Sequence, residues 1–280
     1  MRGTKRPIVL GFLLLTLALL GRPSAVSATW SVIAVDARTG RVVVSSATCV
    51  SQSRLLGFPA KGLMDIQAIV VPGVGVAAAQ AGVDRTRANQ TLIYEQLKEG
   101  TDPRLILDML MQDPDIERRQ FGIVDLQGRS IGFSGSGNGA ASLSRQGRVP
   151  GTDIWYSVQG NILASDAVVL NAARALEEAP GDITDKVMAA MEAADAAGGD
   201  RRCTCETEPV PDAPCDGRNA HVAYILAADR DDPEGASFND GRYAMFIDVT
   251  DENIEAHENG NPVITLRMRY DAWKAGNGLE

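Results

Sequence analysis

Four extended runs open the globular part of the chain. Large apolar residues alternate with small or polar ones in WSVIAVDA, and a turn at Arg38-Thr39-Gly40-Arg41 separates this run from VVVSSA. A second pair of extended runs flanks Pro72-Gly73. A period of two is typical of strands, and turn residues between such runs favour hairpins. The first four elements are therefore predicted to be strands, over residues 30–37, 42–47, 65–71 and 75–80.

Helical and extended blocks alternate through the rest of the chain. Apolar residues recur at helical spacing in 84–99, 103–112, 166–178, 182–197 and 263–274. Extended runs bounded by turn residues occupy 119–125, 130–134, 156–163, 221–228 and 243–249. Asp102-Pro103 and Asp182 supply helix starts, and Gly198-Gly199 supplies a stop. The stretch 134–150 is rich in glycine and serine, so we expect an exposed loop there.

This order of blocks decides the fold class. Strands and helices come in pairs, whereas a doubly wound parallel sheet alternates them singly. The economical arrangement is an α+β fold in which two antiparallel sheets pack face to face and helices cover each outer face, a four-layer αββα sandwich. No stretch of the chain resembles a linker, so residues 29–280 are expected to form one domain.

Composition and charge exclude several classes of protein. The chain is 45% hydrophobic and 22% charged, which is typical of a soluble globular protein and excludes disorder or a multi-span membrane protein. Its formal charge is −9, and it becomes −13 without the first 28 residues, which hold four basic residues and no acidic one. So acidic a protein is not attracted to nucleic acid through its net charge.

The first 28 residues have the pattern of a secretory signal peptide. Basic residues precede the apolar run IVLGFLLLTLALL, and small residues follow at Val26 and Ala28. As a helix this run would span about 20 Å, too short for a hydrocarbon core of about 30 Å. We therefore expect cleavage after Ala28, a mature chain that begins at Thr29, no stable membrane insertion, and a secreted or periplasmic location.

Four cysteines would then face an oxidising compartment. Cys203, Cys205 and Cys215 lie in a polar, proline-rich segment, and Cys49 lies far away in the sequence. Pairing is expected there, and a disulfide from Cys203 or Cys205 to Cys215 is predicted, with the connectivity left open. The chain has only two histidines, so a zinc site is not favoured, and neither a metal nor a cofactor is expected.

Cleavage before Thr29 would place an α-amine and a hydroxyl on one residue. Such an amine has a pKa of about 7.7 to 8.0, so part of it is neutral near pH 7. A neutral α-amine can act as general base for the hydroxyl of its own residue, which makes an N-terminal Thr a nucleophile and base together. The plain alternative is that the peptidase selects small residues near its cut, with no catalytic meaning.

Four segments of the chain resemble one known family. They are ATWSVIAVDARTGRVVVSSA, YSVQGNIL, AAGGDRR and NPVITLRMRYDAW, and the similarity extends over residues 29–274. The family is domain of unknown function 1028, whose members are grouped with the N-terminal nucleophile hydrolases. The resemblance implies an αββα sandwich and makes Thr29 the proposed nucleophile.

Further site residues follow from the matching motifs. Asn161 in SVQGN is the first candidate for stabilising an oxyanion, with backbone amides near Gly160 as helpers. Gln159 would orient a substrate amide or satisfy a strand end. Asp200 and Arg201 of GGDRR would tune the α-amine or bind a substrate carboxylate, or else form a structural ion pair that closes a loop.

Gln80 is a further candidate for substrate binding. It follows Ala79, at a place where the family commonly has Thr-Gln, so this chain lacks a hydroxyl there.

Two functions fit these residues. The first is a secreted hydrolase that cleaves an amide or acyl bond of a small-molecule or peptide-like substrate. The second is a non-catalytic secreted binding module on the same fold. Neither requires nucleic acid, and both leave a homo-oligomer open.

Overall fold

Two antiparallel sheets lie face to face in the computed structural model, which describes residues 29–58 and 60–277. Sheet A has the strand order β10-β9-β2-β1-β8-β7, and sheet B has the order β3-β4-β5-β6. The strands of sheet A are β1 (Thr29–Asp36), β2 (Val42–Thr48), β7 (Leu143–Arg148), β8 (Ile154–Asn161), β9 (Val222–Ala228) and β10 (Met245–Thr250). The strands of sheet B are β3 (Ala68–Val71), β4 (Gly75–Ala81), β5 (Arg119–Asp125) and β6 (Ser130–Ser134).

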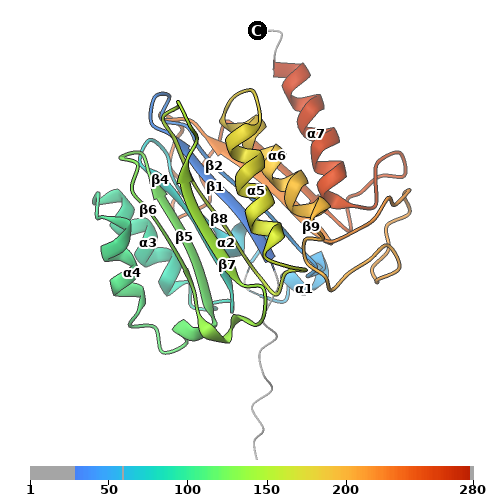
Figure 1. Ribbon diagram of the computed structural model, residues 1–280, viewed down its shortest axis with the longest axis horizontal. Coiled ribbons are helices and arrows are strands. Elements are labelled where there is room, and N and C mark those ends of the chain that lie inside the picture. Colours follow the sequence, from blue (N-terminus) through green and yellow to red (C-terminus); the bar gives the residue numbers. More distant parts are fainter. Residues whose placement is uncertain (1–28, 59, 278–280) are drawn as a thin grey trace, which may run out of the picture.

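Helices cover the outer face of each sheet, which confirms the predicted αββα sandwich (Figure 1). Sheet B is covered by α3 (Ala88–Lys98) and α4 (Pro103–Leu110). Sheet A is covered by α5 (Ala167–Glu178), α6 (Ile183–Ala196) and, over β9 and β10, α7 (Pro262–Asn277). Short helical turns η1 (Ile116–Arg118) and η2 (Ser136–Asn138) precede β5 and follow β6. Among the described residues no helix combines the length and apolar character needed to cross a membrane.

Local sequence signals set the ends of these helices. The carboxylate of Asp102 accepts the backbone N–H of Arg104, and Pro103 occupies the first turn of α4. Asp182 and Asp185 form a reciprocal capping box at the start of α6. After α6 the chain turns through Gly198, whose φ of +98° favours glycine.

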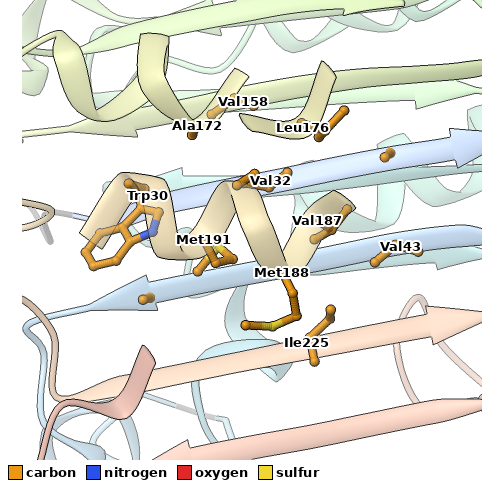
Figure 2. Packing of buried hydrophobic residues seen from close by; sticks show 14 of the residues in the cluster. Trp30, Val32, Val43, Val158, Ala172, Leu176, Val187, Met188, Met191 and Ile225 are labelled. Carbon is orange, nitrogen blue, oxygen red and sulfur yellow. The ribbon is translucent and has the colours of Figure 1, made fainter. Parts of the chain in front are cut away.

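The alternation along β1 assigns its two faces. Trp30, Val32 and Ala34 point to the helices, where Figure 2 shows Trp30 and Val32 beside Val187 and Met191 of α6. Ile33 and Val35, on the other face of β1, point to sheet B, and the apolar side chains on both faces are buried. Burying one such aliphatic side chain contributes about 1.5–3 kcal/mol. This packing holds β1 rigidly in the centre of sheet A.

Two predicted elements were wrong in part, and one short helix was missed. Two short helices, α1 (Gln52–Leu55) and α2 (Leu63–Gln67), separate β2 from β3, so residues 65–67 belong to a helix and not to a strand. Leu63 and Ile66 of α2 are spaced for one helical face, and both are buried. The expected loop at 134–150 contains β7, a half-exposed edge strand whose polar residues hide the strand pattern.

Two disulfides tie the chain together. Cys205 pairs with Cys215, one of the two predicted alternatives, and Cys49 pairs with Cys203, a pairing that the sequence did not indicate. The predicted signal peptide, residues 1–28, lies outside the described residues.

Candidate active site

The layer between the two sheets is polar at one end and apolar at the other. The inward side chains of β1 are Thr29 and Ser31, followed by Ile33 and Val35. Strand β8 repeats this pattern, since its last inward residues are polar, and so does sheet B. The buried polar residues on these inward faces include Thr29, Ser31, Ser46, Thr48, Ser157, Gln159, Asn161, Gln67, Gln80 and Gln120. The polar end of this layer is therefore the end where β1 begins.

Thr29 lies in the middle of this polar end. The register pairs it with Thr48 on β2 and with Asn161 on β8, so the three side chains share one face of sheet A. Directly opposed side chains of an antiparallel pair have Cβ atoms about 5 Å apart. The Thr29 hydroxyl donates to Thr48 Oγ1 at 3.3 Å, and the residue is only 3% exposed. The hydroxyl therefore donates to Thr48 and shares this face of the sheet with Asn161.

A small pocket opens beside Thr29. Its volume is about 20 Å³, and we call it the Thr29 pocket. Its polar wall contains Thr29, Thr48, Gln67 and Gln80, while α1, α2 and β4 supply aliphatic side chains. At this volume the pocket has room for about one water molecule.

Gln80 connects Thr29 to sheet B. Its Nε2 donates to the Thr29 carbonyl at 3.0 Å and to Gln120 Oε1 at 2.7 Å. Its Oε1 accepts from Ser31 Oγ and from Gln67 Nε2, both at 2.6 Å. All four hydrogen-bonding positions of the amide are used within the protein. Gln80 therefore positions Thr29, and the predicted direct contact with a substrate stays a prediction.

Replacing Gln80 by methionine is expected to lower the free energy of unfolding by about 2–4 kcal/mol. The substitution keeps the volume but leaves buried groups on Ser31, Gln67 and Gln120 without their partner, and each such group costs about 1–3 kcal/mol. Urea denaturation at neutral pH measures the change. The matched control is Gln127→Met in an exposed hairpin turn, and an equal, small loss in both variants would contradict this account.

Gln159 is enclosed between the sheets. Its Nε2 donates to Ser31 Oγ and its Oε1 accepts from Ser157 Oγ, at 2.6 and 2.7 Å. A Cβ at Gly122 of β5 would lie 2.2 Å from Gln159 Oε1, so only glycine leaves room for this amide. Two roles were predicted for Gln159, orienting a substrate amide or satisfying hydrogen-bonding groups at a strand end. The structure favours the second role, because the Gln159 amide bonds buried serines and does not line the Thr29 pocket.

The chain is strained immediately after Asn161. Ile162 has a φ of +54°, a left-handed conformation that is rare for a β-branched residue. Such outliers persist only where the surrounding structure enforces them, and they gather at functional sites. Gly160, just before, is paired on both sides, with Trp30 and Leu143, and its carbonyl accepts from Gln120. The expected free backbone amides near Gly160 are therefore engaged in the sheet.

Asp200 lies at the same end of sheet A and is fully buried. Its carboxylate accepts the backbone N–H of Cys49, the residue after Thr48, at 2.9 Å. Its partner in an ion pair is Arg202, at 2.6 Å, and the proposed pairing with Arg201 is wrong. The carboxylate of Asp200 also accepts the backbone N–H of Arg202, which closes a turn over residues 200–202. This turn brings the side chain of residue 202, and not that of residue 201, to the carboxylate. Arg201 is exposed.

His221 is buried beside this end of β2. Its backbone N–H donates to the Thr48 carbonyl at 2.7 Å, while Nδ1 has no partner among the described residues. Burial lowers the pKa of its imidazole to about 4, and the positive charges of Arg218 and Arg202 act in the same direction. The side chain is thus neutral in the folded protein at neutral pH.

Acid is expected to destabilise the protein through His221 before most carboxylates titrate. The unfolded imidazole binds a proton near pH 6.5 and the folded one only near pH 4, so stability is present above pH 6.5 and is lost as the pH falls toward 4. The loss amounts to about 3 kcal/mol. Urea unfolding between pH 7 and 5 should show a weaker pH dependence in His221→Gln, and an unchanged one in the exposed control His257→Gln.

Thr48, Gln67 and Gln120 belong to this site and were missed by the sequence analysis. Gln120 and Gln80 stand at inward positions of strands whose other inward residues are small or apolar. A polar residue that interrupts the apolar face of a predicted strand was the available signal. Gln67 lies in α2, which was predicted as a strand, so its direction could not be inferred.

Comparisons with known proteins agree with this architecture. The model of the family described as "Family of unknown function (DUF1028)" matches residues 29–206. The crystal structure of protein SPO2555 from Silicibacter pomeroyi, assigned to the same family model, is similar with a TM-score of 0.62 and 20% sequence identity, over 89% of this chain and 87% of that chain. No curated protein matches. At this identity the likeness to the solved structure shows the fold alone.

Proposed function

We propose that this chain, which belongs to the family of unknown function DUF1028, is an N-terminal nucleophile hydrolase in its mature form. Thr29 begins the central strand of sheet A, and its hydroxyl lies beside a pocket. The mature protein would cleave an amide or acyl bond of a small-molecule or peptide-like substrate. The observation that carries the proposal is the position of Thr29, in register between Thr48 and Asn161.

The proposed activity requires removal of residues 1–28. Cleavage after Ala28 would free the α-amine of Thr29 at the start of β1 and leave residues 29–280 as the functional domain. The two disulfides support export to an oxidising compartment, secreted or periplasmic. Without this cleavage the Thr29 nitrogen is an amide and cannot act as a base.

In the proposed mechanism the neutral α-amine accepts the proton of the Thr29 hydroxyl as Oγ1 attacks the carbonyl carbon. Asn161, the neighbour of Thr29 on the same face of the sheet, is the proposed donor to the oxyanion. The α-ammonium then returns the proton to the leaving group, and water releases the acyl group from Thr29. Thr48 and Gln80 fix the hydroxyl and the carbonyl of Thr29, so both are positioning residues.

Asp200 is proposed to act through the end of β2. It holds the N–H of Cys49, and thereby the neighbouring Thr48, in place. Its charge is already balanced by Arg202, so tuning of the α-amine by Asp200 would be modest. Binding of a substrate carboxylate by the exposed Arg201 stays a proposal that its position permits.

A covalent adduct tests the proposed function. Protein whose first residue is Thr29, checked by intact mass, is treated with a β-lactone probe, and the labelled peptide is sequenced. We expect one acyl group on Oγ1 of Thr29. A variant with one additional alanine before Thr29 keeps the hydroxyl but moves the amine, so it should label far more slowly. Labelling elsewhere, or equal labelling of the extended variant, contradicts the mechanism.

The second candidate is a non-catalytic secreted binding module. The observation that favours it is the small size of the Thr29 pocket, about 20 Å³, against a cavity of about 470 Å³ elsewhere in the protein. On this alternative the polar layer at Thr29 only links the two sheets. The absence of any adduct on correctly processed protein would favour it.

A further inference from the structure

A large pocket lies at the opposite end of sheet A from Thr29. Its volume is about 470 Å³, and we call it the far-end pocket. It is bounded by the turn after β1, the turn between β7 and β8, and the loop that leads into α6. Asp36, the last residue of β1, lines it, so it lies about 23 Å from Thr29 at the usual rise of about 3.3 Å per residue. It is separate from the Thr29 pocket.

Most charged groups of this pocket have partners within the protein. Arg41 binds Asp229 with two hydrogen bonds, at 2.6 and 3.0 Å. Asp36 accepts the backbone N–H of Arg38 at 2.9 Å, and its carboxylate lies 4.0 Å from the Arg38 guanidinium. These charges therefore offset one another.

The two remaining acids are also paired. Asp153 lies 2.8 Å from Arg148, and Asp182 lies 2.8 Å from Lys274 while it caps α6. Although burial opposes ionisation, hydrogen bonds from Lys274 and Thr184 hold the pKa of Asp182 at about 2. None of the acids that line the pocket thus depends on a ligand for a partner.

Lys186 is the exception among these charges. It lines the pocket, it is only 8% exposed, and no Asp or Glu of the described chain lies within 4.0 Å of its ammonium group. Nζ donates to the carbonyl of Ala179 at the end of α5. A cation near a helix C-terminus is favourable, but this contact uses one of the three N–H donors. Burying an unpaired charge is costly unless a counter-charge arrives.

We propose that the far-end pocket binds a small anionic molecule, with the ammonium group of Lys186 as the partner of its carboxylate or phosphate. A volume of about 470 Å³ is in the range of pockets that take metabolite-sized ligands. The bidentate pair of Arg41 and Asp229 lines the pocket, and so do the exposed Gly151 and Gly181. This site does not depend on the chemistry of Thr29.

Titration of the processed protein with three probes tests the proposal. Succinate, acetate and inorganic phosphate are added at constant ionic strength, with chloride as the reference, while backbone amide signals are followed by NMR. We expect saturable shifts at Thr152, Gly181 and Ile183 and none around Thr29. Saturation by the carboxylates alone or by phosphate alone identifies which anionic group the site takes.

Variants at Lys186 sharpen the test. Lys186→Met should weaken binding at least tenfold, whereas Lys186→Arg should retain most of it. Lys61→Met removes an exposed lysine elsewhere and should leave the affinity unchanged. Equal affinity of Lys186→Met and wild type would overturn the proposal. If Lys186→Met fails to fold, the wild-type titration decides, since shifts that do not saturate, or that map away from the far-end pocket, would also overturn it.

Discussion

Replacement of Thr29 by alanine is expected to abolish acylation by the β-lactone probe and to lower any hydrolysis by about three orders of magnitude or more. The substitution removes Oγ1, the one atom that forms the bond to the substrate in the proposed mechanism. It leaves the backbone of β1 and the hydrogen bond from Gln80 to the Thr29 carbonyl. The stability of the fold should therefore change little while the chemistry is lost.

The test compares three variants that begin at residue 29, produced from a cleavable fusion so that processing is not a variable. Thr29→Ser keeps a hydroxyl and an α-amine and should keep measurable labelling. Thr39→Ala is the matched control, because Thr39 lies in the exposed turn after β1, at the other end of the strand. Labelling of Thr29→Ala at the wild-type rate would show that another residue is the nucleophile.

The fold was predictable because alternation is a strong signal in β1, β2, β4 and β5. Each of these strands has one face against helices and one against the other sheet, so a period of two, or a continuous apolar run, is enforced by burial on both sides. Strand β7 was not predicted because it is an edge strand with one neighbour, and its charged residues Arg145 and Arg148 are typical of a loop. Helix α2 was not predicted because a helix of about one turn is too short to show a helical period in the sequence.

The candidate site was predictable only in part. Thr29 and Asn161 follow from the ends of two strands and from the family motifs. The register places these two residues side by side, and their proposed roles stay predictions. The hydrogen bonds of Gln80 could not be assembled from the sequence, because Gln67 was assigned to a strand and because the bonds of Gln80 with Ser31 and with the Thr29 carbonyl form only when sheet B packs on sheet A. Hydrogen bonds between sheets depend on relative placement, which a single sequence does not encode locally.

The two pockets differ in the chemistry of their walls. The Thr29 end is closed by hydrogen bonds between neutral side chains, with few ionised groups, so a neutral amine could act as a base there. The far end is lined by ion pairs and a buried lysine, which suits recognition of charge. Strand β1 runs from one pocket to the other and is buried along its whole length.

Loss of the disulfide between Cys49 and Cys203 is expected to be the largest single change in stability. The bridge spans 154 residues, and the chain-entropy relation gives about 5 kcal/mol for a loop of that length. The bridge between Cys205 and Cys215 spans 10 residues, for which the same relation gives about 2.7 kcal/mol. Urea unfolding of Cys49→Ala/Cys203→Ala and of Cys205→Ala/Cys215→Ala measures both losses against oxidised wild type.

The first of these bridges should also affect the Thr29 site. Cys49 follows Thr48, and its N–H is held by Asp200, so the bridge anchors the end of β2 to the segment after Asp200. We expect probe labelling of Thr29 to slow in Cys49→Ala/Cys203→Ala under conditions where the protein remains folded. The short bridge lies in an exposed loop, so its removal should leave labelling unchanged. Equal effects of the two double variants on both stability and labelling would mean that the long bridge contributes neither chain restraint nor positioning of Thr48.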